Sequence, residues 1–90
     1  MQSRTNAHQA DEPADLSGMV AAVSQQLRDL LREIETHVDE QHQHAKASMD
    51  VDEMQRLTDA DPFRWLADAR HSLQAGMMFA ERAISQPVTF

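Results

Sequence analysis

Residues 61–87 read DPFRWLADARHSLQAGMMFAERAISQP and predict one long helix with a defined start and end. Asp61 stands at the N-cap position and Pro62 at the first helical position, a pair that commonly begins a helix. Pro87 ends the helix, because the residue before a proline resists the helical conformation. We therefore expect a helix over about residues 62–85, which spans roughly 35 Å at ~1.5 Å per residue.

This predicted helix has two apolar seams with alternating three- and four-residue spacing. The larger seam, which we expect to pack on another helix of the chain, consists of Phe63, Leu66, Arg70, Leu73, Met77, Ala80 and Ile84. The second seam is rich in small residues and consists of Trp65, Ala69, Ser72, Gly76, Phe79 and Ala83. Gly76 costs about 1 kcal/mol relative to Ala inside a helix. A second molecule that approaches this seam closely would explain the glycine, and a glycine tolerated at a frayed surface is the alternative.

The partner helix is predicted over about residues 15–45, with Asp15 as its N-cap. Its apolar positions recur every three or four residues and form one stripe: Leu16, Met19, Val20, Val23, Leu27, Leu30, Leu31, Ile34 and Val38. The periodicity fades after Val38, so the helix end is expected between about residues 40 and 47. Residues 1–13 are polar and aperiodic and are predicted to be a disordered arm. The hairpin domain then covers residues 14–90, with a short helix or a loop over about residues 46–60.

Composition indicates an all-α fold. Ala, Gln, Leu, Met, Glu and Arg are plentiful, whereas β-branched and aromatic residues are sparse and the chain has only two Gly and three Pro. An antiparallel hairpin of two long helices has one seam and little interior, so we expect it to assemble into a homo-oligomer. The sequence has no Cys, no apolar run near the ~20 residues that span a bilayer, and no secretory signal in MQSRTNAHQADEPAD. A soluble intracellular protein is the expectation.

Charge is distributed unevenly along the chain. The net charge of −7 argues against non-specific binding of nucleic acid, which needs a basic surface. Residues 1–61 carry five basic and thirteen acidic side chains, for −8, whereas residues 62–90 carry three Arg against two acids, for +1. Arg is suited to two-pronged recognition of phosphate. An anion site is therefore expected in the last third of the chain; arginines that serve only as helix surface residues are the alternative.

The third side of the helix over residues 62–85 carries polar, cationic and sulfur-containing side chains. Its members are Arg64, His71, Gln74, Ala75, Met78 and Arg82. Guanidinium groups at both ends of this strip would contact phosphates, while bases would pack on Met78 or Trp65. A solvated helix face is the alternative.

Residues 64–87 resemble the signature of a family of phage proteins that sequester cyclic oligonucleotides and so counter the bacterial CBASS defence. Relatives with the same hairpin counter the Thoeris defence. The family pattern is R-W-x-x-x-A-(K/R)-x-x-L-Q-x-G-x-M-x-x-x-R-A-I-x-Q-P. Thirteen positions match it without a gap: Arg64, Trp65, Ala69, Arg70, Leu73, Gln74, Gly76, Met78, Arg82, Ala83, Ile84, Gln86 and Pro87.

The resemblance implies a nucleotide sponge rather than an enzyme. Such a protein holds the signalling nucleotide without cleaving it, needs no cofactor, and acts in the cytoplasm of the infected bacterial host. Family members form homo-oligomers, hexamers in the best-known cases, and bind cyclic dinucleotides and trinucleotides between subunits. The resemblance therefore implies a hexamer or another even-numbered assembly, with no DNA, RNA or membrane as partner.

The resemblance also implies which residues bind the ligand. By position, Arg64 is expected to contact phosphate. Family members carry a Lys early in helix one and an aromatic residue before it; here the N-terminal arm has no aromatic, and Ser24, Gln25, Gln26 and Arg28 occupy the region of the Lys. The ligand thus stays open among a cyclic dinucleotide, a cyclic trinucleotide and a cyclic ADP-ribose signal. Beside Arg64, the candidate ligand-binding residues are Arg82, His71, Gln74, Trp65, Met78, Arg70, Ser24, Gln25 and Arg28.

Two other functions compete with the sponge. His37, Glu40 and His44 lie at i, i+3 and i+7, with His42 and Asp39 nearby, a spacing that would suit a metal ion on one helix face. A solvated polar helix end explains these residues equally well, and we predict no metal site. The second competitor is a helical-hairpin assembly or adaptor protein, which binds another protein through an exposed apolar strip.

Overall fold

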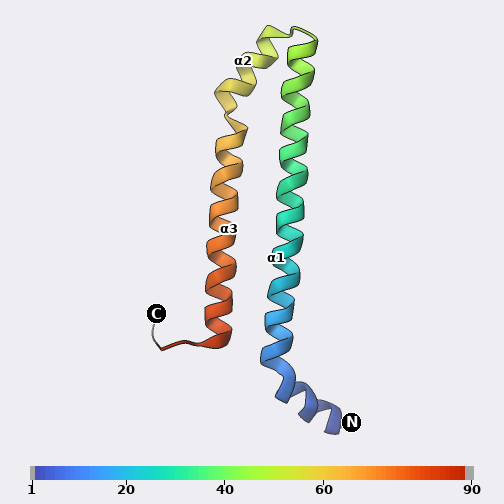
Figure 1. Ribbon diagram of the computed structural model, residues 1–90, viewed down its shortest axis with the longest axis vertical. Coiled ribbons are helices and arrows are strands. Elements are labelled where there is room, and N and C mark those ends of the chain that lie inside the picture. The colour runs from blue at the N-terminus through green and yellow to red at the C-terminus, as the bar shows by residue number, and fades with distance from the viewer. Residues whose placement is uncertain (1, 89–90) are drawn as a thin grey trace.

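A computed structural model describes residues 2–88, with side chains described from residue 15 onward. Three helices follow one another: α1 (Gln2–Ala47), α2 (Val51–Ala60) and α3 (Pro62–Ser85). The helices α1 and α3 lie side by side and run in opposite directions, with α2 connecting them at one end of the hairpin (Figure 1). The described chain measures 66 × 34 × 12 Å, so the hairpin is a single layer of helices with two broad faces. The predicted all-α hairpin is confirmed.

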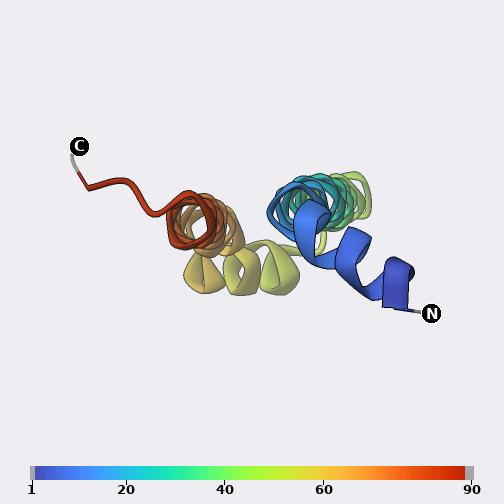
Figure 2. The ribbon, with the colours of Figure 1, turned by 90° about the horizontal axis from the view of Figure 1, so that it is seen from below.

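The start of α1 differs from the prediction. The helical conformation continues through Asp15 back to Gln2, over the residues predicted to form a disordered arm. Residues 2–14 contain three Ala and two Gln, which are strong helix formers even where no apolar stripe accompanies them. The N-terminal part of α1, drawn in blue, turns away from the axis of the rest of the helix (Figures 1 and 2). Pro13 lies in this part of the chain, and a proline inside a helix bends it because it has no N–H to donate.

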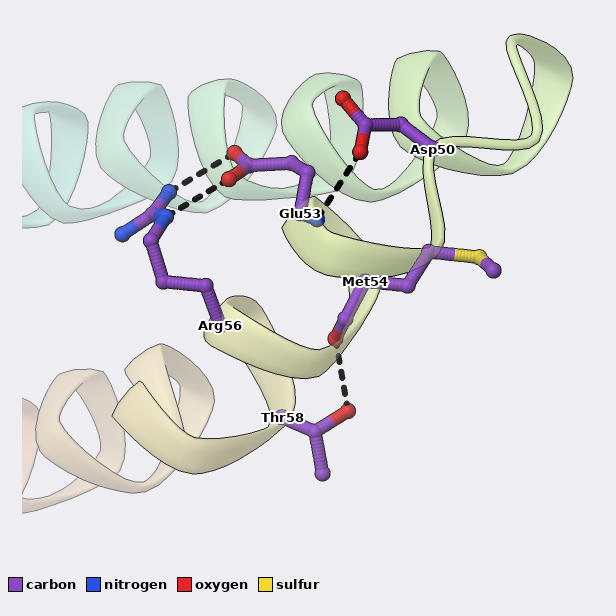
Figure 3. Close-up of polar contacts among 5 residues, drawn as sticks. All are labelled: Asp50, Glu53, Met54, Arg56 and Thr58. Carbon is purple, nitrogen blue, oxygen red and sulfur yellow. Dashed lines mark hydrogen bonds and ion pairs between the residues drawn. The ribbon is translucent and has the colours of Figure 1, made fainter.

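A short capped helix connects the two long ones (Figure 3). Met49 adopts a left-handed conformation, with φ of 55°, and α1 ends before it. Asp50 is the N-cap of α2, and its carboxylate accepts a hydrogen bond from the Glu53 N–H at 3.1 Å. Arg56 donates from Nε and Nη2 to the two oxygens of Glu53 at 2.6 and 2.8 Å. The connection predicted as a helix or a loop is therefore a helix over residues 51–60.

The pair of Glu53 and Arg56 makes a small part of the stability depend on pH. Hydrogen bonds from the Arg56 guanidinium lower the pKa of the Glu53 carboxyl from its ordinary value of 4.5. A carboxyl with a lowered pKa in the folded state stabilises the fold fully above its ordinary pKa, and this contribution is lost as the pH falls through the lowered value. The pair is exposed to solvent, so the contribution is small.

The Asp50 cap leads to a first prediction. We expect Asp50→Ala to lower the free energy of unfolding by about 1 kcal/mol, because one N–H of the first turn of α2 loses its acceptor. For a domain of this size that corresponds to a fall in melting temperature of roughly 4–8 °C, measurable by circular dichroism. Asp50→Asn keeps a capping oxygen and should retain most of the stability. A loss as large for Asn as for Ala would show that the cap is not the cause.

Asp61 begins α3 in a way that the sequence did not predict. The residue is left-handed (φ 50°, ψ 56°) because it also closes α2, where its N–H donates to the Leu57 carbonyl. Among the described residues, its side chain makes no capping hydrogen bond to α3 and instead forms an ion pair with Arg64, Oδ2 to Nε at 3.7 Å. The predicted position of the cap and the first-turn Pro62 are thus correct, whereas the side-chain cap is absent. At the other end, Gln86 is left-handed before Pro87, as expected for a helix that stops there.

The core of the hairpin, where α1 packs on α2 and α3, is thin. Among the described side chains, the buried apolar residues are Leu31, Val38, Ala45, Leu57 and Leu66, each at most 6% exposed. The larger seam of α3 faces α1 as predicted, since Leu66 is buried and Arg70, Leu73, Met77, Ala80 and Ile84 are half-buried. Phe63 is 41% exposed and its ring stacks on His42, with 5.2 Å between ring centroids.

The predicted apolar stripe of α1 divides into two. Leu27, Leu31 and Val38 are directed toward α3, as their burial shows. Five other members of the stripe are 39–63% exposed: Leu16, Met19, Val23, Leu30 and Ile34. The apolar surface of α1 is therefore wider than the strip that one partner helix can cover. Within residues 2–88, none of the helices combines the length and apolarity needed to cross a membrane.

Candidate anion-binding groove

One broad face of the hairpin is hollowed by a groove of about 290 Å³ between α1 and α3. Its rim carries three guanidinium groups, from Arg28 and Arg32 on α1 and from Arg70 on α3. Arg28 and Arg32 are one helical turn apart and therefore lie on the same side of α1. Arg28 directly follows Leu27, and Arg32 directly follows Leu31, and both leucines point toward α3. The two arginines therefore lie at the edge of the contact between α1 and α3, not on the side of α1 that faces away from α3.

The floor of the groove is apolar and its walls are polar. Leu27, Leu31, Leu73 and Met77 form the floor, and the remaining lining residues are Ser24, Glu35 and Gln74. A second hollow of about 240 Å³ continues from the groove and shares Ser24 and Met77 with it. The lining of this second hollow includes Met78 and Glu81. The lining of the first hollow carries three arginines and one carboxylate, whereas the charged residue in the lining of the second is Glu81.

The arginines of the groove are held loosely by neighbouring side chains. Arg70 Nη2 lies 3.7 Å from Glu35 Oε1, across the two helices, and Arg32 Nη1 lies 3.5 Å from Asp29 Oδ1. Arg28 donates to the amide oxygen of Gln25 at 3.0 Å. Exposed contacts of this kind contribute little to stability, and each guanidinium has five N–H donors. The arginines can therefore turn toward an anion without destabilising the fold.

The groove is cationic in an acidic chain. Three guanidinium groups and one carboxylate line it, which gives 3 − 1 = +2, whereas the whole chain carries −7. A guanidinium group binds phosphate through two parallel hydrogen bonds, and the apolar floor offers contact area to a flat ring. The arrangement therefore suits a ligand that joins phosphate groups to flat apolar rings.

The structure brings together four of the predicted ligand-binding residues in this groove: Ser24, Arg28, Arg70 and Gln74. Gln25 lies beside it, as the acceptor for Arg28, and Met78 lines the second hollow. Arg32 and Glu35 also line the groove but were not predicted from the sequence as ligand-binding residues. The signal for Arg32 was its position four residues after Arg28 and directly after Leu31. Glu35 could be assigned only from the register of the two helices, which places it opposite Arg70.

Arg64 and Trp65 form a separate exposed pair near the start of α3. The Arg64 guanidinium lies 4.6 Å from the centre of the Trp65 ring, and the ring is 60% exposed. His71 and Arg82 are also exposed and do not line the groove. Arg64 and Arg82 are eighteen positions apart, or roughly 27 Å along α3. The predicted strip therefore does not place both arginines on one small nucleotide within one protomer.

The histidines near the end of α1 do not form a metal site in the structure. Among the described residues, no group of three or more His, Asp or Glu side chains is arranged to hold a metal ion. His42 directs Nδ1 to the Val38 carbonyl oxygen at 2.8 Å, while its ring stacks on Phe63. This histidine is therefore part of the packing between α1 and α3.

Comparison with known proteins adds no relative to these observations. Neither the family models nor the curated proteins give a match to this sequence. The family resemblance of residues 64–87 therefore stays a prediction.

Proposed function

We propose that this protein is a non-enzymatic sponge that sequesters cyclic oligonucleotide immune signals and so blocks a CBASS-type defence in the cytoplasm of the infected bacterial host. In this proposal the protein acts as a homo-oligomer. The observation that carries the proposal is the groove, where three guanidinium groups from two helices surround an apolar floor. The resemblance of residues 64–87 to the sponge family supports it independently.

The groove matches the chemistry of a cyclic oligonucleotide. Its phosphates would lie against Arg28, Arg32 and Arg70, in charge-assisted hydrogen bonds. A base would pack on Leu31 and Leu73 of the floor. Gln74, with both donor and acceptor atoms, would bind a base edge. Retention of the ligand is the whole activity of a sponge, so the site needs only groups that bind.

Arg64 and Trp65 offer a second surface for the same type of ligand. An exposed indole ring stacks on bases, and the neighbouring guanidinium group binds phosphate. Both residues belong to the region that resembles the sponge family. We propose that they contact ligand where protomers meet, as the resemblance implies.

Calorimetric titration tests the proposed function. Purified protein would be titrated with cyclic dinucleotides, cyclic trinucleotides and cyclic ADP-ribose isomers, and the bound ligand would then be released by heat and identified by chromatography. Tight binding with recovery of intact ligand is the expected result, and the panel would show which class is bound. Cleaved ligand would exclude a sponge, and a panel without binding would reject the cyclic-nucleotide ligand.

A second candidate function is supported by the exposed aromatic residues. Trp65 and Phe79 are 60% and 61% exposed on α3, as expected of an assembly or adaptor protein that binds another polypeptide. An adaptor requires only this apolar surface, whereas a sponge requires the arginines of the groove. Replacement of the groove arginines should therefore weaken ligand binding by a sponge and leave the binding of another protein by an adaptor unchanged.

A further inference from the structure

The second hollow adjoins the groove and differs from it in charge. Ser24 of α1 and Met77 of α3 line both hollows. Arg28 lies one helical turn beyond Ser24, so a guanidinium group of the groove is close to this shared border. Among the described side chains that line the second hollow, Glu81 is the charged one. A phosphate group is therefore attracted to the groove and repelled from the second hollow.

The sizes of the two hollows indicate that one nucleotide ligand extends over both. The groove measures about 290 Å³ and the second hollow about 240 Å³, whereas sites for small molecules usually begin at about 300 Å³. A cyclic oligonucleotide that is held by a phosphate in the groove would thus extend into an adjoining space. Because the second hollow repels phosphate, the part of the ligand that enters it is a base.

The lining of the second hollow suits a base. Its apolar part is formed by Val20, Ala21, Met77 and Met78. The thioether groups of methionines make favourable contacts with aromatic rings. Ser17 and Ser24 are half-buried beside this apolar surface, and each hydroxyl group can donate and accept hydrogen bonds. A flat ring with polar edges therefore finds both apolar contact and hydrogen-bond partners here.

The Glu81 carboxylate is available to a ligand. It lies on the side of α3 that carries the groove residues, because Glu81 follows Met77 by four positions and Gln74 by seven. Among the described side chains, none forms an ion pair or a hydrogen bond with this carboxylate; Ser85 Oγ donates instead to the main-chain oxygen of Glu81, at 3.0 Å. An ionised carboxylate only accepts hydrogen bonds. Its two oxygens therefore favour a base edge that presents two donors side by side.

Guanine is the nucleobase with such an edge. Its N1–H and its 2-amino group point in the same direction and can donate together to the two oxygens of one carboxylate. Adenine and cytosine have an unprotonated ring nitrogen beside the amino group, and uracil has a carbonyl oxygen on each side of its N–H. These lone pairs would face the carboxylate and repel it. The O6 atom of guanine, on the other side of N1–H, would accept a hydrogen bond from a serine hydroxyl.

We propose that the second hollow binds a guanine base of the cyclic oligonucleotide, with Glu81 accepting hydrogen bonds from N1–H and the 2-amino group. The neighbouring phosphate lies against Arg28 in the groove. This inference rests on the proposed function for the phosphate site and adds the base that the ligand must carry. Among the ligands left open by the sequence, it selects a cyclic di- or trinucleotide that contains guanine, and not a cyclic ADP-ribose, whose base is adenine.

Calorimetric titration of the full chain with cyclic di-GMP and cyclic di-AMP tests the base preference. We expect wild type to bind cyclic di-GMP at least about tenfold more tightly than cyclic di-AMP. Glu81→Gln should abolish this preference, because an amide presents one donor and one acceptor and pairs with adenine as well as with guanine. Glu33→Gln removes the same charge from an exposed position of α1 outside both hollows and should leave the ratio of the two affinities unchanged.

Cyclic di-IMP provides a sharper test, because it differs from cyclic di-GMP only in lacking the 2-amino groups. Wild type should bind it about tenfold more weakly than cyclic di-GMP, since one oxygen of Glu81 then has no donor. Glu81→Gln should bind the two ligands equally well, because its amide can pair with N1–H and O6 of either base.

The outcomes separate this inference from the proposed function. Equal affinities of wild type for cyclic di-GMP and cyclic di-AMP would overturn the guanine assignment and leave the sponge in place. A guanine preference that persists in Glu81→Gln would overturn the role of Glu81. Absence of binding to every cyclic nucleotide would overturn the proposed function and this inference together. Circular dichroism should show the same helix content for wild type and both variants.

Discussion

Simultaneous replacement of Arg28 and Arg70 by Gln is expected to weaken the binding of a cyclic oligonucleotide by at least about 100-fold. Each guanidinium group contributes a charge-assisted hydrogen bond to phosphate, worth roughly 1.5–3 kcal/mol, and each 1.4 kcal/mol is about tenfold in affinity. The two residues come from different helices and line the same groove. Calorimetric titration measures the loss, and circular dichroism should show unchanged helix content.

Two single variants serve as controls for this result. Arg56→Gln removes an arginine of α2, which is exposed outside the groove, and should leave ligand affinity unchanged. Glu35→Gln removes the carboxylate that lies 3.7 Å from Arg70 and should strengthen binding several-fold, because Arg70 then has no competing anion in the groove. Opposite effects of Glu35→Gln and the double variant would locate the phosphate near Arg70.

Full binding by the double variant would reject the groove as the ligand site. Arg64→Ala would then be the informative variant, because Arg64 and Trp65 form the other surface proposed to contact nucleotide. Loss of binding in Arg64→Ala with an unchanged assembly would place the ligand there. Loss of the assembly would instead show that Arg64 is structural.

The boundaries of α3 could be predicted from the sequence because local chemistry determines them. Asp61 and Pro62 mark the start and Pro87 the stop, and the helix runs from Pro62 to Ser85. The N-terminal limit of α1 has no comparable signal. Ala and Gln extend the helix into residues that lack an apolar stripe, and Pro13 is accommodated inside α1.

The groove could be predicted only in part, because it depends on the rotation of each helix about its own axis. The apolar stripe of α1 is wide enough to face α3 in more than one orientation, so the sequence did not distinguish Leu31, which is buried, from Leu30, which is 50% exposed. That orientation determines that Arg28 and Arg32 lie beside the helix contact. The pairing of Arg70 with Glu35 also requires the register between the helices, to which residues far apart in sequence contribute. Residue spacing therefore placed Gln74 on the polar side of α3 and Arg70 in its packing seam, while Arg70 became a ligand-binding candidate only through the family resemblance, and Arg32 and Glu35 were not predicted.

Leu66→Ala is expected to have the largest effect on stability of any single truncation on α3. Leu66 is 6% exposed and is the buried residue of α3. Few other described side chains are buried, so the core depends strongly on this leucine. Truncation of a buried Leu to Ala typically costs about 2–5 kcal/mol. For a domain of this size that is a fall of at least roughly 10 °C in melting temperature.

The measurement must separate folding from assembly, because the apparent stability of an oligomer rises with the protein concentration. Thermal melts of Leu66→Ala and wild type would therefore be compared at the same set of protein concentrations. Val51→Ala, at a residue that is 68% exposed, is the control and should melt within a few degrees of wild type. A melting temperature of Leu66→Ala equally close to that of wild type would show that the contact between α1 and α3 does not hold the hairpin together.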